Sequence, residues 1–177
     1  MSILDCNTGQ KYHIKEMIEY ITNPEKTYPE YIFTTGTTAE MAVDEFLFTK
    51  ILWNKYKPRK REYYQFILTL SDKDIAEDSL KRFSKLVQTA QWFISRWPDL
   101  SEPQFQVISA IHLDKSPVYH AHIIANNVNS FTGAFFPWDK RYFWLMRNLI
   151  NRLFIYYGFT PIPDERLNER SQIPNFF

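Results

Sequence analysis

The chain has 177 residues and a mass of 21.3 kDa, which suits one domain with a core large enough to fold without disulfides. Hydrophobic residues make up 45% and charged residues 23%, as in ordinary globular proteins, so a disordered or fibrous chain is excluded. The net charge of +1 lacks the basic balance of many nucleic-acid-binding domains, so any positive charge that serves DNA must be clustered.

The single cysteine, Cys6, excludes an intramolecular disulfide and a multi-cysteine zinc site. The first ten residues hold neither a basic run nor an apolar segment, so no secretory signal is expected. No apolar stretch approaches the roughly 20 residues of a membrane span. We therefore expect a cytoplasmic protein with no membrane partner.

Hydrophobic spacing and turn residues predict the elements of the first third of the chain. Residues 12–21 carry apolar side chains at helical spacing and predict a first helix. The apolar run 31–34 predicts a short strand. Thr37, with Glu40 three residues on, forms a capping-box pattern that predicts a second helix over 37–54.

The rest of the chain alternates strands rich in aromatic and branched residues with long apolar helices. Strands are predicted over 63–70, 105–113 and 118–127, and helices over 75–96 and 142–157. Because the last two strands adjoin across a short turn, they are expected to pair antiparallel. The predicted fold class is α+β, with a central antiparallel β-sheet, helices packed mainly on one face and the other face open.

Three of the four histidines, His112, His120 and His122, lie within eleven residues. Side chains two apart on a strand share a face, so His120, His122 and Asn126 are expected to point the same way. In a hairpin, His112 can lie opposite this group, with Cβ atoms about 5 Å apart. Asp114 follows closely and could orient an imidazole by accepting its other N–H.

Three neutral imidazoles on one sheet face suit a divalent transition metal and leave coordination positions open. The residues alone leave two chemistries open: activation of water in a metallohydrolase, or polarisation of a phosphodiester under attack by a side-chain nucleophile. A solvated sheet face without a metal is the alternative structural interpretation. His13, isolated on the first helix, is expected to be a surface residue.

These motifs resemble those of plasmid mobilisation relaxases of the MobA type, within the HUH endonucleases. The family signature HxD…HxHxxxN is matched by His112, Asp114, His120, His122 and Asn126. The segment 18–27, which contains Tyr20, resembles the segment that carries the nucleophilic tyrosine. The resemblance covers about residues 1–162, which would form the catalytic domain, with 163–177 as a polar tail.

The resemblance implies that the chain nicks and rejoins one DNA strand at a transfer origin, which initiates conjugative plasmid or mobile-element transfer. Tyr20 would attack the scissile phosphate and become linked to the 5′ end. The three histidines would hold a divalent metal ion, Mn²⁺ or Mg²⁺, and Asp114 would support one of them. Single-stranded DNA is the expected partner, with an accessory DNA-binding protein as a further candidate.

Other interpretations stay open. The chain could be a metal-dependent hydrolase that uses water, or an inactive relative that binds origin DNA without cutting it. Five residues separate Asp114 from His120, one more than the family usually has, which leaves the register of His112 open. Rolling-circle initiators carry the tyrosine on a helix after the histidines, where this chain has Tyr156 and Tyr157. Their apolar-face spacing favours core packing instead.

A basic loop is the expected source of the clustered positive charge. Lys57, Arg59, Lys60 and Arg61 are predicted to contact DNA phosphates, together with Asn126, and Tyr56 could stack on a base. A solvated loop between a helix and a strand is the competing interpretation.

Overall fold

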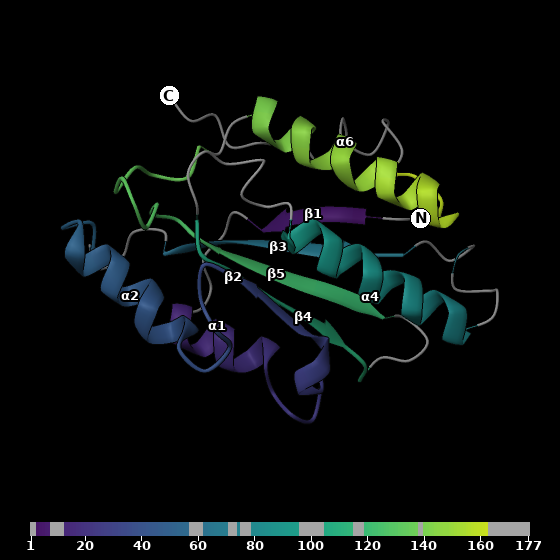
Figure 1. Ribbon diagram of the computed structural model, residues 1–177, viewed down its shortest axis with the longest axis horizontal. Coiled ribbons are helices and arrows are strands. Elements are labelled where there is room, and N and C mark those ends of the chain that lie inside the picture. Colours follow the sequence, from purple (N-terminus) through teal and green to yellow (C-terminus); the bar gives the residue numbers. More distant parts are fainter. Residues whose placement is uncertain are drawn as a thin grey trace.

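In the described part of the chain, the sheet has five strands, all antiparallel, in the order β1-β3-β5-β4-β2. This computed structural model describes residues 3–7, 13–56, 62–70, 74, 79–95, 105–114, 119–137 and 140–162 (Figure 1). The strands are β1 (Ile3–Asn7), β2 (Ile32–Thr35), β3 (Tyr63–Thr69), β4 (Val107–His112) and β5 (His120–Asn126). The helices are α1 (Ile14–Ile21), α2 (Ala42–Leu52), α4 (Ser79–Ser95) and α6 (Lys140–Tyr157), with a 3-10 turn η1 (Pro29–Tyr31). The predicted α+β class is confirmed.

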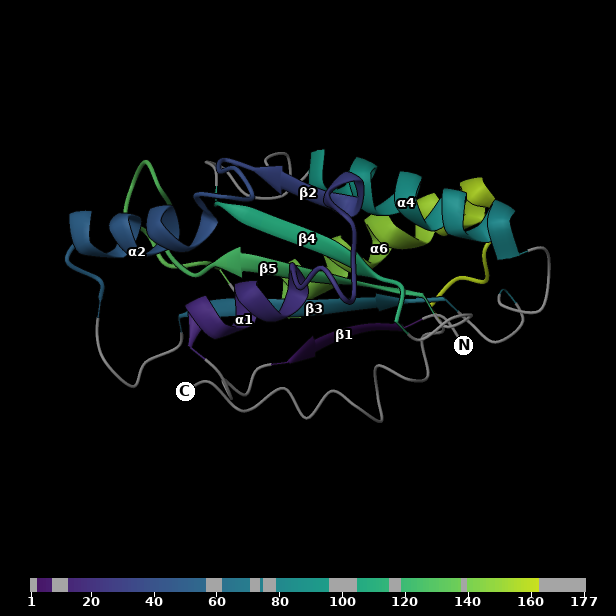
Figure 2. The ribbon, with the colours of Figure 1, turned by 90° about the horizontal axis from the view of Figure 1, so that it is seen from below.

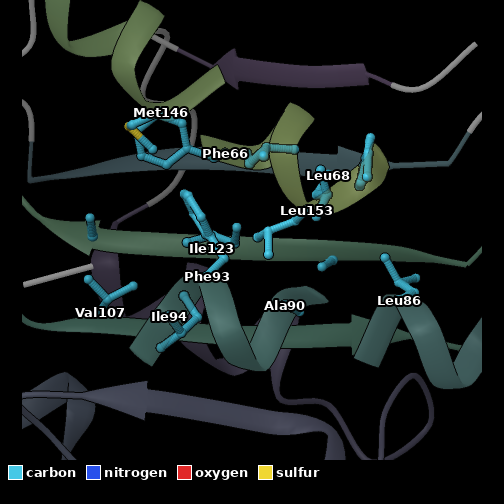
Figure 3. Close-up of a cluster of buried hydrophobic side chains, with 14 of the residues drawn as sticks. Phe66, Leu68, Leu86, Ala90, Phe93, Ile94, Val107, Ile123, Met146 and Leu153 are labelled. Carbon is cyan, nitrogen blue, oxygen red and sulfur yellow. The ribbon is translucent and has the colours of Figure 1, made fainter. Parts of the chain in front are cut away.

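The two longest helices, α4 and α6, cover one face of the sheet, as expected. In the close-up of Figure 3, Phe66 and Ile123 from the strands meet Phe93 of α4 and Met146 of α6, and all four side chains are fully buried. Burying a side chain of this size contributes roughly 1.5–3 kcal/mol. This layer is the larger core, and it fixes the back of the sheet.

The other face is not open, because α1 and α2 pack on it. Figure 2 shows α1 in front of the strands, with α6 behind them. The apolar stripe of α1 is buried against the sheet, and its members are Ile14, Met17, Ile18 and Ile21. A helix with such a stripe must bury it, so α1 closes part of the face that was predicted to be open.

Two elements differ from the predictions. Helix α2 begins at Ala42, so the capping box at Thr37 is wrong: the Thr38 hydroxyl accepts the Met41 N–H at 3.3 Å instead. Strand β1 has no counterpart in the predictions. It is short and lies at the sheet edge beside β3, and such a strand gives little periodic signal.

The remaining predicted elements are found with shifts of a few residues at their ends, and the described parts of the long helices match. None of the described helices is long and apolar enough to cross a membrane. The basic cluster of Lys57, Arg59, Lys60 and Arg61 and the tail 163–177 lie outside the described residues.

Helix α2 buries a lysine. Lys50 is 2% exposed, and its amine has no hydrogen-bond partner among the described residues. Burial lowers the pKa of Lys50 to about 8, against the attraction of the Glu62 carboxylate, which raises it. A protonated amine without a hydrogen-bonded partner is costly to bury, so Lys50 destabilises the folded chain at neutral pH.

We expect Lys50→Met to raise the free energy of unfolding at pH 7 by about 1–3 kcal/mol, because the apolar stem stays and the charge is removed. The folded pKa lies below the ordinary 10.5, so the unfolded state binds more protons between pH 8 and 10.5. Stability of the native chain should therefore rise over that window, by up to about 3 kcal/mol from this group.

Urea denaturation at pH 7 to 10.5 measures both effects. The matched control is Lys15→Met, at an exposed position of α1, which should change neither the stability nor its pH dependence. A Lys50→Met chain that keeps the native rise with pH would contradict the assignment to Lys50.

Candidate functional site

The three clustered histidines converge on one face of the sheet. Strands β4 and β5 pair so that His112 lies directly opposite His120, with Ala110 opposite His122. The ring centroids are 4.4 Å apart for His112 and His122, 4.9 Å for His120 and His122, and 5.2 Å for His112 and His120. One ligand nitrogen from each histidine lies within 4.8 Å of the others. The extra residue after Asp114 therefore leaves the expected register intact.

His112 is held in a form that can bind a metal. Its Nε2–H donates to the Ile21 carbonyl oxygen at 3.1 Å, which leaves the lone pair on Nδ1. The Nδ1 atom is buried and has no hydrogen-bond partner in the described part of the chain. Burial lowers the pKa of His112 to about 4, although the bond to Ile21 raises it, so the ring is neutral at pH 7. A buried lone pair of this kind fits a metal ligand.

His122 contacts a glutamine from the neighbouring strand. The side-chain amide of Gln65, which is 7% exposed, lies with Nε2 3.1 Å from His122 Nδ1. A half-turn of the amide puts its oxygen at that place, where it accepts an Nδ1–H and leaves Nε2 of His122 for a metal. Partners of this kind orient the ring of a metal-binding histidine. The sequence signal for Gln65 is weak: it is a polar side chain among the aromatic and branched residues of a predicted strand.

Tyr20 lies against this histidine group. Its ring meets His112 and His122 edge-on, with centroids 5.4 and 5.7 Å apart, and the residue is 41% exposed. The Lys26 amine lies 3.6 Å from the centre of the Tyr20 ring. A solvent-accessible phenol therefore stands beside the histidines, with a cation next to it.

Glu62, which precedes β3, fixes the helix that carries Tyr20. Its carboxylate accepts the Ile14 N–H at the start of α1 at 2.8 Å and lies 3.2 Å from His13 Nδ1. Hydrogen bonding to Glu62 raises the pKa of His13, which is exposed as expected. An acidic group at a helix N-terminus is favourable, so this contact anchors α1 over the sheet.

The other predicted site residues lie in different settings. Asp114 is exposed, and its charge is a lesser influence that raises the pKa of His112. Asn126 is fully buried, and its amide donates to the Phe46 carbonyl oxygen at 3.2 Å and to Gln106 Oε1 at 2.8 Å. Asn126 thus joins α2 to the sheet, and this burial does not fit the predicted contact with DNA.

The rival tyrosines lie on α6, across the sheet from the histidines. Tyr157 packs against the core formed with α4, as expected. Tyr156 is 81% exposed, so the expectation of core packing is wrong for it. Helix α6 belongs to the opposite layer from α1, so neither ring adjoins the histidines.

The comparison with protein families agrees with this geometry. Residues 20–159 match the family model described as relaxase, MobA/VirD2-like, nuclease domain. The match spans most of the chain, beginning at Tyr20 and including all three histidines, so the chain belongs to the MobA/VirD2-like relaxase family. A search of curated proteins found no significant match. The fold and the family together define a relaxase nuclease domain with a candidate divalent metal site at the histidines.

If Gln65 orients His122, we expect Gln65→Leu to weaken Mn²⁺ binding about 10- to 100-fold. Gln65→Glu should keep the affinity, because a carboxylate also accepts the Nδ1–H. Titration calorimetry of Mn²⁺ into each variant measures this. Gln106→Leu is the matched control, since it removes a buried amide on the same face that does not contact the histidines. Equal affinities for Gln65→Leu and the native chain would rule out this role.

Proposed function

We propose that this chain nicks and rejoins single-stranded DNA at a transfer origin through a covalent bond between Tyr20 and the 5′ phosphate. The observation that carries the proposal is the packing of the Tyr20 ring against His112 and His122. A nucleophile and three candidate metal ligands therefore share one site, although about 90 residues separate them in the sequence.

The reaction would be a transesterification. The Tyr20 oxygen forms a bond to the scissile phosphorus while the bond from phosphorus to the 3′ oxygen breaks. The phenol proton passes to water, and the 3′ oxygen takes up a proton and leaves as a hydroxyl. One phosphodiester replaces another, so the reverse step rejoins the strand without a nucleotide cofactor.

His112, His120 and His122 would hold the divalent ion, with Mn²⁺ or Mg²⁺ the expected metals. When bound, the ion would draw negative charge from the scissile phosphate. The Ile21 carbonyl oxygen holds His112 with a lone pair on Nδ1, and Gln65 with its amide turned would orient His122 in the same way. We propose that the negative charge of Asp114 stabilises positive charge at the site, since the same charge raises the pKa of His112.

Positive charge would position the DNA backbone. Lys26, whose amine lies over the Tyr20 ring, places a cation where a phosphate must approach. Lys57, Arg59, Lys60 and Arg61 are proposed as further phosphate contacts from the sequence. We propose residues 1–162 as the catalytic domain of a cytoplasmic protein that acts in plasmid or mobile-element transfer, with an accessory DNA-binding protein as a candidate partner.

A covalent-adduct assay tests the proposal. The protein is incubated with Mn²⁺ and a pool of single-stranded origin-like oligonucleotides, and denaturing gels with peptide mass spectrometry locate any linked nucleotide. We expect the adduct on Tyr20. An adduct on Tyr156 or Tyr157 would overturn the choice of nucleophile. Absence of an adduct, with Mn²⁺ bound at the histidines, would favour the water-using hydrolase or the inactive DNA-binding relative.

A further inference from the structure

A group of exposed aromatic rings lies at the end of the sheet away from His120. Tyr56, Phe131 and Phe135 are 49%, 64% and 56% exposed. Both ribbon views place α2, which Tyr56 follows, and the loop 127–137 together at this end (Figures 1 and 2). Clustered apolar surface of this kind marks an interaction site more often than a plain solvated surface.

Trp53 joins the two segments that carry the rings. Its Nε1–H donates to the Ser130 carbonyl oxygen at 3.1 Å. Gly133 has φ +68°, and a Cβ there would lie 2.6 Å from the Trp53 ring, so the loop backbone packs directly on the indole. The Lys55 amine lies 4.9 Å from the centre of the Phe135 ring. The loop that carries Phe131 and Phe135 is therefore packed against the end of α2, next to the segment that carries Tyr56.

The loop that presents two of the rings is held by hydrogen bonds. The side-chain oxygen of Asn129, a buried residue, accepts the backbone N–H groups of Phe131 at 2.8 Å and Thr132 at 2.9 Å. The Asn129 carbonyl oxygen accepts the Gly133 N–H at 3.0 Å, and Val128 bridges to Phe135. Because the backbone is fixed in this way, the rings are held outward before any ligand binds.

The charge beside the rings is positive. Residues 55–61 contain five of the chain's 21 lysines and arginines and no acidic residue, and residues 126–137 contain no charged residue. In a chain with a net charge of only +1, these cations are concentrated around Tyr56 in the sequence, and the described one, Lys55, lies beside Phe135. Exposed rings with adjacent cations are the two features with which proteins bind single-stranded nucleic acid.

We propose that Tyr56, Phe131 and Phe135 form a stacking platform for bases of single-stranded DNA that flank the scissile site. The inference rests on the proposed function for its DNA substrate. Strand β5 runs from His120 to Asn126, so the end of the strand that leads into the platform loop lies roughly 20 Å from His120 and roughly 13 Å from His122 at 3.3 Å per residue. The platform would therefore bind nucleotides several positions away from the scissile phosphate and act without the metal.

The test is the binding of fluorescein-labelled oligo(dT) of 20 nucleotides, measured by anisotropy with EDTA present and in a Tyr20→Phe background. The triple variant Tyr56→Ala/Phe131→Ala/Phe135→Ala should bind about 100-fold more weakly or worse, since each stacked ring contributes about fivefold or more. The slope of log affinity against log salt should not change, because no phosphate contact is removed.

The matched control is Leu145→Ala/Ile155→Ala/Tyr156→Ala, which removes three exposed side chains of α6 on the other layer and should bind like the native chain. A second measurement on the native protein is photo-crosslinking of an oligonucleotide containing 5-iodouracil, with crosslinks expected in peptides carrying Tyr56, Phe131 or Phe135.

Native affinity in the platform variant, no binding of oligo(dT) by the native chain, or crosslinks only elsewhere would overturn the platform. Because these measurements need neither metal nor nicking, loss of binding in the platform variant would support the platform even where no Tyr20 adduct forms. An adduct on Tyr20 with unchanged binding by the platform variant would support the proposed function and overturn the platform.

Discussion

Tyr20→Phe should abolish covalent attachment to DNA, with a loss of about a thousandfold or more, to the detection limit of the gel assay. The ring would stay in place against His112 and His122, and only the attacking oxygen is removed. Mn²⁺ affinity should be unchanged, because all three histidine ligand atoms remain. The measurement is adduct yield with Mn²⁺ at equal DNA occupancy.

Tyr156→Phe and Tyr157→Phe are the matched controls for this experiment. Both remove one phenol oxygen from α6, on the opposite layer of the fold, and both should give native adduct yield. Persistence of cleavage in Tyr20→Phe would instead indicate that water is the nucleophile, as in the hydrolase interpretation.

The second large effect is expected at the histidines. His112→Ala should lower Mn²⁺ affinity by about a hundredfold or more, because it removes a ligand atom and not just a partner of one. The yield of the DNA adduct should fall together with the Mn²⁺ affinity. EDTA should likewise lower the adduct yield of the native chain. Calorimetry and the adduct assay, each run at several Mn²⁺ concentrations, measure the two effects.

His13→Ala is the control of the same residue type. His13 is exposed and contacts Glu62, away from the three-histidine group, so its loss should leave Mn²⁺ affinity native. Native Mn²⁺ affinity in a folded His112→Ala chain would place the metal elsewhere and remove this residue from the site.

Much of the histidine site could be predicted from short-range patterns. Strand residues alternate between faces, so the spacing of His120 and His122 places both on one side whatever surrounds them. A hairpin then brings His112 opposite His120, as the register shows. Another local signal, the content of aromatic and branched residues, predicted β3 and β5.

The partners of these residues could not be predicted, because they come from elements far away in the chain. Gln65 reaches His122 only because β3 pairs with β5, and the Ile21 carbonyl reaches His112 only because α1 lies across the sheet. For Asn126 the predicted face is correct but the predicted exposure is not. Helix α2 covers that end of the face and buries the side chain.

The sequence by itself therefore determined the antiparallel core, the three histidines on one face and a candidate tyrosine among eleven. Only the tertiary structure decided that Tyr20 is the tyrosine beside the histidines, and that α2 exposes Ile51 while it buries Lys50. The physical reason is the difference between local and long-range interactions. Periodicity fixes which face a residue takes within its own element, whereas the contacts between elements depend on how all the apolar faces of the chain are buried together.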